Sequence, residues 1–145
     1  MNIEIKVFNK FNDEVINFLI NESYILFSKL RKCENVALDM KNKLKDSLKQ
    51  MYIKNNKDSD KIYVAYNLDS IVGCAYITEK GYLSDLFVKE DYQNQGIGSS
   101  ILNKILFDFK DSDIILDSNF LAVDFYKKHN FKIIEQKNNY IKMKK

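Results

Sequence analysis

The sequence predicts an α+β protein, a mixed α/β chain in which one sheet carries helices. Segments whose apolar residues alternate with polar ones, as in strands, are interleaved with segments whose apolar residues recur at helical spacing. The 145 residues suit one domain, and a chain of this length can bury a core without disulfides. No internal repeat or low-complexity linker divides the chain. We therefore expect residues 1–145 to form a single domain.

The N-terminal half predicts a strand, two helices and a hairpin, in that order. Residues 2–8 alternate between apolar and polar, which is typical of a strand. Residues 12–30 open with acidic side chains and carry an apolar stripe at helical spacing, and residues 35–52 repeat this pattern. Two apolar runs, 61–67 and 70–77, flank a short turn and predict a β-hairpin.

The C-terminal half predicts a third consecutive strand and then helix, strand, helix and two strands. The third strand covers residues 81–88, and the helix after it begins near Ser99. Residues 113–117 form a short apolar run typical of an interior strand. Residues 119–129 predict a helix whose first residue, an asparagine, is a preferred N-cap. Residues 131–143 predict two strands joined by a tight Lys-Asn-Asn turn.

The composition excludes several classes of protein. The net charge of +3 is too small to demand a nucleic-acid partner, and the lysines of the second helix are explained more simply as a solvated face than as a patch for acidic partners. The two cysteines, Cys33 and Cys74, form neither a disulfide framework nor a metal-ligand spacing. No apolar segment suits a signal peptide or a membrane span. We expect a cytoplasmic protein without a metal, in which Cys74 is buried.

Residues 93–98, Gln-Asn-Gln-Gly-Ile-Gly, link a predicted strand to a predicted helix and are called the glycine loop below. Unpaired N–H groups at a helix start, together with the helix dipole, favour an anion such as a phosphate. The alternative is a tight turn whose glycines only make room for packing. The P-loop string is absent, and the dinucleotide fingerprint lacks its third glycine, at Ile101. Asp117 nevertheless lies where a ribose-binding acid is expected.

Two motifs carry a resemblance to a known family. The glycine loop matches Q/R-x-x-G-x-G/A, and residues 119–131 match N-x-x-A-x-x-F-Y-x-x-x-G-F with Asn130 at the glycine position. Over residues 60–145 the chain therefore resembles the GNAT superfamily of acyl-CoA N-acyltransferases. The resemblance implies a central twisted, mostly antiparallel sheet of six to seven strands with about four helices, splayed at the acetyl-CoA site. Asparagine tolerates the left-handed conformation, so the last helix can still end at Asn130. Gln93 replaces the commoner arginine, which leaves phosphate binding to backbone donors.

The resemblance also implies acetyl-CoA as a co-substrate and the residues that hold it. The glycine loop would bind the diphosphate through N–H groups, and the strand before the loop would pair with the pantetheine arm. The implied cofactor-binding residues are Leu86, Phe87, Val88, Gln93, Asn94, Gln95, Gly96, Ile97, Gly98, Ser99, Asn119 and Phe125.

The implied reaction is direct attack of a primary amine on the acetyl thioester. Tyr126 stands at the family's general-acid position, where a neutral phenol can protonate the leaving thiolate. Asp85 is the first candidate for the general base, because it precedes the strand residues that would hold the reactive carbonyl, and Glu79 is the second. We expect the single histidine, His129, on the surface and not in catalysis.

The acceptor is left open by the sequence. In this family the acceptor pocket would involve roughly residues 30–40 and 137–140, and neither stretch carries a readable code. A small amine, an antibiotic, an amino acid, a peptide and a protein all remain candidates. A non-catalytic acyl-CoA-binding or regulatory domain is the alternative function, and an RNA-directed protein is a third. We expect no membrane or nucleic-acid partner, and a homodimer stays open.

Overall fold

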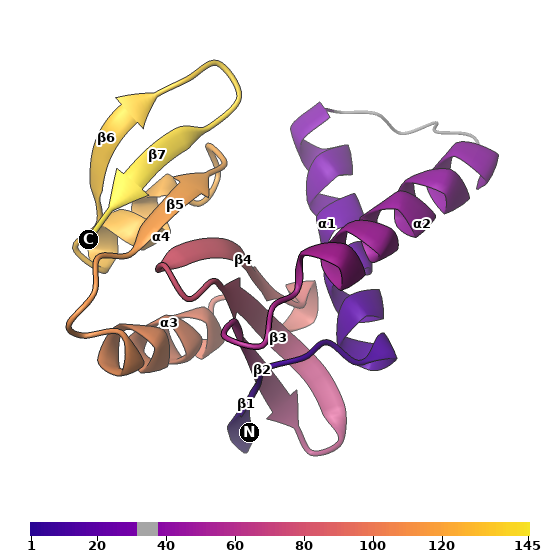
Figure 1. The fold of residues 1–145 in the computed structure, drawn as a ribbon, viewed down its shortest axis with the longest axis horizontal. Coiled ribbons are helices and arrows are strands. Elements are labelled where there is room, and N and C mark those ends of the chain that lie inside the picture. Colours follow the sequence, from indigo (N-terminus) through magenta and orange to yellow (C-terminus); the bar gives the residue numbers. More distant parts are fainter. Residues whose placement is uncertain (32–37) are drawn as a thin grey trace.

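In a computed structural model, residues 1–31 and 38–145 form seven strands and four α-helices (Figure 1). The strands are β1 (Ile3–Phe8), β2 (Lys61–Asn67), β3 (Ser70–Ile77), β4 (Tyr82–Val88), β5 (Ile115–Ser118), β6 (Lys132–Gln136) and β7 (Ile141–Lys144). The helices are α1 (Asp13–Arg31), α2 (Leu38–Asn55), α3 (Ile97–Asp108) and α4 (Val123–Lys128), with a short 3₁₀ helix, η1, at Glu90–Tyr92. The predicted order of elements is confirmed.

One sheet contains all seven strands, in the order β1-β2-β3-β4-β5-β7-β6. Every neighbouring pair is antiparallel except β4 and β5, which run parallel. The expectation of a mostly antiparallel sheet of six to seven strands is therefore confirmed. Among the described residues, no helix is both long enough and apolar enough to cross a membrane.

Helices cover both faces of the sheet, and a buried apolar cluster lies under each pair (Figure 1). On one face, α1 and α2 pack Leu19 and Tyr52 against strand residues that include Cys74, which is buried as expected. On the other face, α3 and α4 contribute Ile101 and Tyr126 to the larger cluster. The two clusters are called the α1–α2 core and the α3–α4 core below.

The pairing of β3 with β4 contains one extra residue, Ser84. Residues 76 and 77 are consecutive in β3, but they pair with Asp85 and Leu83. Side chains alternate along a regular strand, so without this bulge Leu83 and Asp85 would point to the same face. Leu83 instead packs in the α3–α4 core, whereas Asp85 contacts Tyr52 of α2 on the opposite face. The bulge therefore turns Asp85 toward α2.

The starts of the two helices near the candidate site differ from the sequence prediction. Helix α3 begins at Ile97, two residues before the expected start. Helix α4 begins only at Val123, and Asn119 caps the turn before it, where its Oδ1 accepts the N–H groups of Leu121 at 2.9 Å and Ala122 at 3.1 Å. These local bonds satisfy the backbone in a turn and delay the helix. Asn130 adopts the expected left-handed conformation, with φ of 68°.

Candidate active site

The parallel strands β4 and β5 diverge along their length. They pair only at Tyr82 with Ile115 and at Leu83 with Leu116, near the start of both strands. Beyond Leu83, β4 remains paired with β3 through residues 85–88, while its other edge has no strand partner among the residues that the structure describes. The expected splay is present, and Leu86, Phe87 and Val88 lie on the opened edge. An extended ligand could pair with such an edge through backbone groups.

A cavity of about 280 Å³ lies where the two strands separate, and it is called the central cavity below. Strands β4 and β5 form its walls, α4 contributes Tyr126, and the β6–β7 turn contributes Tyr140. Its lining residues are Leu26, Leu83, Ser84, Asp85, Leu86, Phe87, Leu116, Asp117, Ser118, Asn119, Tyr126, Asn139 and Tyr140. The structure thus brings the predicted acid, the predicted base and Asn119 to one cavity.

Asp85 is a half-buried carboxylate with one free oxygen. Its Oδ1 accepts a hydrogen bond of 3.2 Å from the Tyr52 hydroxyl, while Oδ2 is buried and, within the described part of the chain, has no partner. Burial disfavours the charged form and raises the pKa of Asp85 to about 6, although hydrogen bonds from Tyr52 and Ser84 act in the opposite direction. A carboxylate with a pKa near neutrality and an unpaired oxygen in a cavity is suited to accept a proton.

Tyr126 lies in the first full turn of α4 and is only 8% exposed. Its ring packs edge-on against Phe125 and Phe131, with centroid separations of 5.2 and 5.6 Å. Burial, with a contribution from the Asp85 charge, raises the pKa of Tyr126 well above its usual value. The phenol therefore stays protonated at neutral pH and can donate its proton into the central cavity.

The glycine loop presents free N–H groups at the start of α3. Gly96 is the N-cap and has φ of 83°, and a Cβ built on it meets no atom within 4 Å. In the described structure, residues 94–99 donate no backbone hydrogen bond, and the helical ladder starts with the Ser100 N–H bonding to the Gly96 carbonyl at 2.9 Å. Open space in front of unpaired donors at a helix N-terminus suits an anion.

The second glycine of the loop serves a different purpose. A Cβ on Gly98 would lie 3.4 Å from the Phe125 ring and 3.5 Å from Val88 Cγ2. Gly98 therefore lets α3, α4 and the end of β4 approach one another. Both interpretations of the loop apply, with the free donors near Gly96 and the packing at Gly98.

The two glutamine side chains of the glycine loop make hydrogen bonds to backbone carbonyls on its N-terminal side. The Gln93 amide donates to the Val88 carbonyl at 2.9 Å, and the Gln95 amide donates to the Asp91 carbonyl at 3.1 Å. These side chains hold the loop against the end of β4 and against η1. Both glutamine amides are thus already hydrogen-bonded within the protein, whereas, among the described residues, the backbone N–H groups of residues 94–99 are not.

His129 is placed differently from its expected surface position. It is half-buried at the end of α4, 5.0 Å from the Phe125 ring between centroids, and its Nε2 lies 3.1 Å from the Ser99 hydroxyl. Burial and the nearby Lys145 ammonium lower the pKa of His129. An imidazole therefore stands beside the N-terminus of α3, a contact that distance along the sequence does not suggest.

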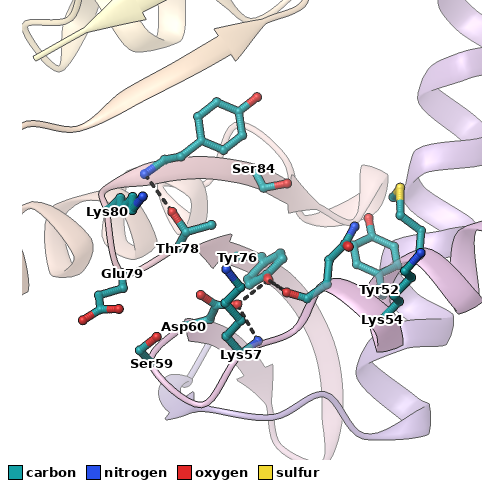
Figure 2. A pocket seen from close by; sticks show the side chains of 13 residues that line it. Tyr52, Lys54, Lys57, Ser59, Asp60, Tyr76, Thr78, Glu79, Lys80 and Ser84 are labelled. Carbon is teal, nitrogen blue, oxygen red and sulfur yellow. Dashed lines mark hydrogen bonds between the residues drawn. The ribbon is translucent and has the colours of Figure 1, made fainter.

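A second, larger cavity of about 500 Å³ was not anticipated from the sequence (Figure 2). It lies between the end of α2 and the β3–β4 turn, and we call it the lysine cavity. Its lining residues are Met51, Tyr52, Lys54, Asn55, Lys57, Ser59, Asp60, Tyr76, Thr78, Glu79, Lys80, Tyr82 and Ser84. Glu79, the second candidate base, is exposed in this cavity and does not line the central one.

The structure describes the expected acceptor-pocket segments only in part. The acceptor segment expected at 30–40 falls partly on residues 32–37, which lie outside the described residues. Tyr140, from the expected segment 137–140, lines the central cavity. Within residues 1–31 and 38–145, no group of three or more His, Cys, Asp or Glu side chains could hold a metal ion.

Comparisons with known proteins agree with this geometry. A family model described as an acetyltransferase (GNAT) domain matches residues 31–143. The PaiA N-acetyltransferase of Thermoplasma acidophilum, solved in complex with coenzyme A, has a TM-score of 0.75 at 18% identity, covering 100% of this chain and 99% of that one. An acyl-CoA N-acyltransferase of Pseudomonas aeruginosa has a TM-score of 0.70 at 11% identity, covering 99% of each chain.

An acetyltransferase of the GNAT family from Staphylococcus aureus Mu50 has a TM-score of 0.63 at 17% identity, covering 98% of each chain. At these identities the solved structures share the fold. No curated protein sequence matches the chain.

Proposed function

The chain belongs to the GNAT acetyltransferase family and is an acyltransferase, and from this premise we propose that it transfers the acetyl group of acetyl-CoA directly to a primary amine. One observation carries the proposal. The free buried oxygen of Asp85 and the protonated phenol of Tyr126 line the same cavity at the opening between β4 and β5. A base and an acid on one cavity suit a reaction that takes a proton from an amine and gives one to a leaving thiolate.

The residues present fit coenzyme A. Its diphosphate needs N–H donors that the protein does not use itself, and residues 94–99 offer them in front of the open space at Gly96. Its pantetheine arm carries amides, and within the described ranges the edge of β4 at Leu86 to Val88 has no strand partner. Asn119 lies in the turn before α4 and Phe125 lies within α4, and both complete the proposed site. When bound, acetyl-CoA supplies an acyl group activated as a thioester.

Backbone donors on the opened edge of β4 would also hold the oxygen of the reacting carbonyl. Such preorganised donors are worth on the order of 10²-fold or more in rate in acyl-transfer enzymes. The divergence of β4 from β5 leaves this edge exposed to the central cavity. The same structural feature therefore supports both binding and catalysis.

Asp85 would act on the acceptor from the α2 side of the sheet. An alkylamine with a pKa of ~10.4 is protonated at neutral pH and must lose a proton before it attacks. Asp85 Oδ2 is buried, has no partner among residues 1–31 and 38–145, and can accept that proton, directly or through water. Tyr126 belongs to α4 on the other face and would donate a proton to the departing thiolate sulfur. The reacting carbon would then lie between the two groups.

The first test is calorimetry of the purified protein with coenzyme A, followed by measurement of thiol release from acetyl-CoA with a panel of primary amines. We expect coenzyme A to bind and at least one amine to be acetylated. Absence of binding would refute the proposal. Binding without acetylation across the panel would favour a domain that binds acyl-CoA but does not use it for this reaction.

A further inference from the structure

We propose that the acceptor is a primary amine that also carries an anionic group, and that the lysine cavity binds this group while the amine reaches Asp85. The inference rests on the proposed function, because it names the acceptor class for the same reaction. It is carried by the position, the charge and the shape of the lysine cavity.

The lysine cavity adjoins the central cavity. Ser84, the bulged residue of β4, lines both. Tyr52 lines the lysine cavity and donates its hydroxyl to Asp85, and Tyr82 lines it and donates its hydroxyl to Asp117 at 2.8 Å. Both carboxylates belong to the central cavity. A molecule with one end at Asp85 could therefore extend into the lysine cavity past Ser84.

The lysine cavity carries an excess of positive charge. Lys54, Lys57 and Lys80 line it, and in the described part of the chain none of their ammonium groups has an ion-pair partner. Figure 2 shows Lys54 on one side of the cavity and Lys80 on the other, with Lys57 between them. Three unpaired ammonium groups around one cavity favour an acceptor with an anionic group and disfavour an acceptor with a second ammonium group.

The two acidic residues of the lysine cavity cancel only part of this charge. Asp60 is 2% exposed, and its Oδ2 accepts the Tyr76 hydroxyl at 2.5 Å and the Lys57 backbone N–H at 2.9 Å. Asp60 therefore holds the loop before β2, and its carboxylate keeps its negative charge. Glu79 is exposed, and Figure 2 shows it beside Lys80. The three lysines still outnumber these two carboxylates.

The walls of the lysine cavity suit the body of a small organic molecule. The side chains of Met51, Tyr52 and Tyr76 contribute apolar surface, and the volume of about 500 Å³ is typical of small-ligand sites. In an amine with an alkyl linker and a terminal carboxylate, the amine would lie at Asp85, the linker against these apolar side chains, and the carboxylate near the lysines.

The test compares three acceptors of equal chain length, namely 6-aminohexanoate, hexylamine and 1,6-diaminohexane, by thiol release from acetyl-CoA. We expect the highest kcat/KM for the amino acid and the lowest for the diamine. A higher kcat/KM for hexylamine or for the diamine would overturn the inference. Failure of all three acceptors in a protein that binds coenzyme A would also overturn it, whereas failure to bind coenzyme A would refute the proposed function itself.

A matched pair of triple variants tests the lysines directly. In Lys54→Gln/Lys57→Gln/Lys80→Gln, KM for 6-aminohexanoate should rise on the order of tenfold, because each exposed charge contributes modestly. The same variant should change kcat/KM for hexylamine by a much smaller factor, because hexylamine carries no anionic group for the lysines to bind. The control Lys6→Gln/Lys43→Gln/Lys110→Gln makes the same charge change at exposed positions outside the cavity and should change neither constant. Equal effects of the two triple variants would overturn the inference.

Discussion

The Tyr52 hydroxyl donates a hydrogen bond of 3.2 Å to Asp85 Oδ1 and leaves Oδ2 of the same carboxylate without a partner in the described structure. The bond joins α2 to the bulged strand β4. It stabilises the charged form of Asp85 and so opposes the effect of burial on the pKa of this carboxyl. Tyr52 is therefore a positioning residue whose removal should change how activity depends on pH.

The variant Tyr52→Phe should move the acidic limb of the kcat/KM profile, which reports pKa values of the free enzyme, to higher pH. In the wild type the limb should have its midpoint near the Asp85 pKa of about 6. Loss of the hydroxyl raises this pKa, so more of the carboxyl is protonated at a given pH and less of it can act as a base. The control Tyr66→Phe alters another tyrosine that packs against the α1–α2 core. Coinciding profiles for wild type and Tyr52→Phe would contradict this role.

The variant Asp85→Asn should lose activity but gain stability at neutral pH. Burial raises the pKa from 3.8 to about 6, so the folded state binds the proton more tightly than the unfolded state. The free energy of unfolding of the wild type should then fall as pH rises from about 4 to 6 and remain lower above that. Asparagine avoids this loss, which by linkage amounts to at most about 3 kcal/mol.

Urea unfolding at pH 4 and at pH 7.5 measures this difference. The free energy of unfolding of Asp85→Asn should exceed that of the wild type at pH 7.5 but not at pH 4. Its kcat should be lower by about 10²-fold or more. The control Asp111→Asn, at an exposed carboxylate, should match the wild type at both values. A destabilised Asp85→Asn protein at pH 7.5 would show that the charge is compensated in the native state.

The variant Tyr126→Phe should slow turnover by about 10²-fold while coenzyme A binds with unchanged affinity. Phenylalanine preserves the ring packing against Phe125 and Phe131 and removes only the proton donor. The control Tyr63→Phe removes the hydroxyl of a buried tyrosine that bonds to Asp108 at the far end of α3. Steady-state rates and calorimetry separate the two effects. Normal turnover in Tyr126→Phe would exclude it as the acid.

Alanine at the two loop glycines should have opposite effects on stability. Gly96→Ala forces a side chain into a left-handed conformation, which costs about 1 kcal/mol, and it projects a methyl group where the diphosphate is proposed to bind. Gly98→Ala lies inside α3, where alanine favours the helix, and its methyl group only contacts Phe125 and Val88. Thermal unfolding and coenzyme A calorimetry should therefore rank Gly98→Ala above Gly96→Ala. The reverse order would contradict the roles assigned to these glycines.

The affinity for coenzyme A should increase as pH falls through the pKa of His129. Its imidazole lies 3.1 Å from the Ser99 hydroxyl at the start of α3, and a bound diphosphate would attract the protonated ring. Binding should therefore raise the His129 pKa, which burial and Lys145 lower in the free protein. The chain has one histidine, so a single imidazole resonance reports both values by NMR. An unchanged titration on binding, or the same pH dependence in His129→Gln, would contradict this coupling.

Local patterns were sufficient to predict the order of the elements and the position of the glycine loop. The alternation in residues 61–67 and 70–77 and the apolar stripe through Ile101 and Ile105 arise from contacts within single elements. Asn119 was expected to be the N-cap of the last helix, but it caps the turn before α4, whose N-cap is Ala122. The boundary was wrong because the Asn119 side chain stabilises a preceding turn over a helical start.

The lysine cavity and the orientation of Asp85 could not be predicted in the same way. Both depend on register, since one extra residue in β4 decides which face a side chain occupies. The cavity also assembles Lys54 from α2 with Lys80 from the β3–β4 turn, and no spacing links the two. His129 meets Ser99 only because Gly98 lets α4 approach α3.

The bulge at Ser84 adds to β4 one residue that pairs with none in β3. Deleting this serine would make Leu83 and Asp85 consecutive, so regular alternation would keep Leu83 in the α3–α4 core and Asp85 on the side of α2. The deletion would instead remove the one side chain of β4 that lines both cavities and that hydrogen-bonds to Asp85. A one-codon deletion here would therefore alter the passage between the two cavities while the base kept its place on the sheet.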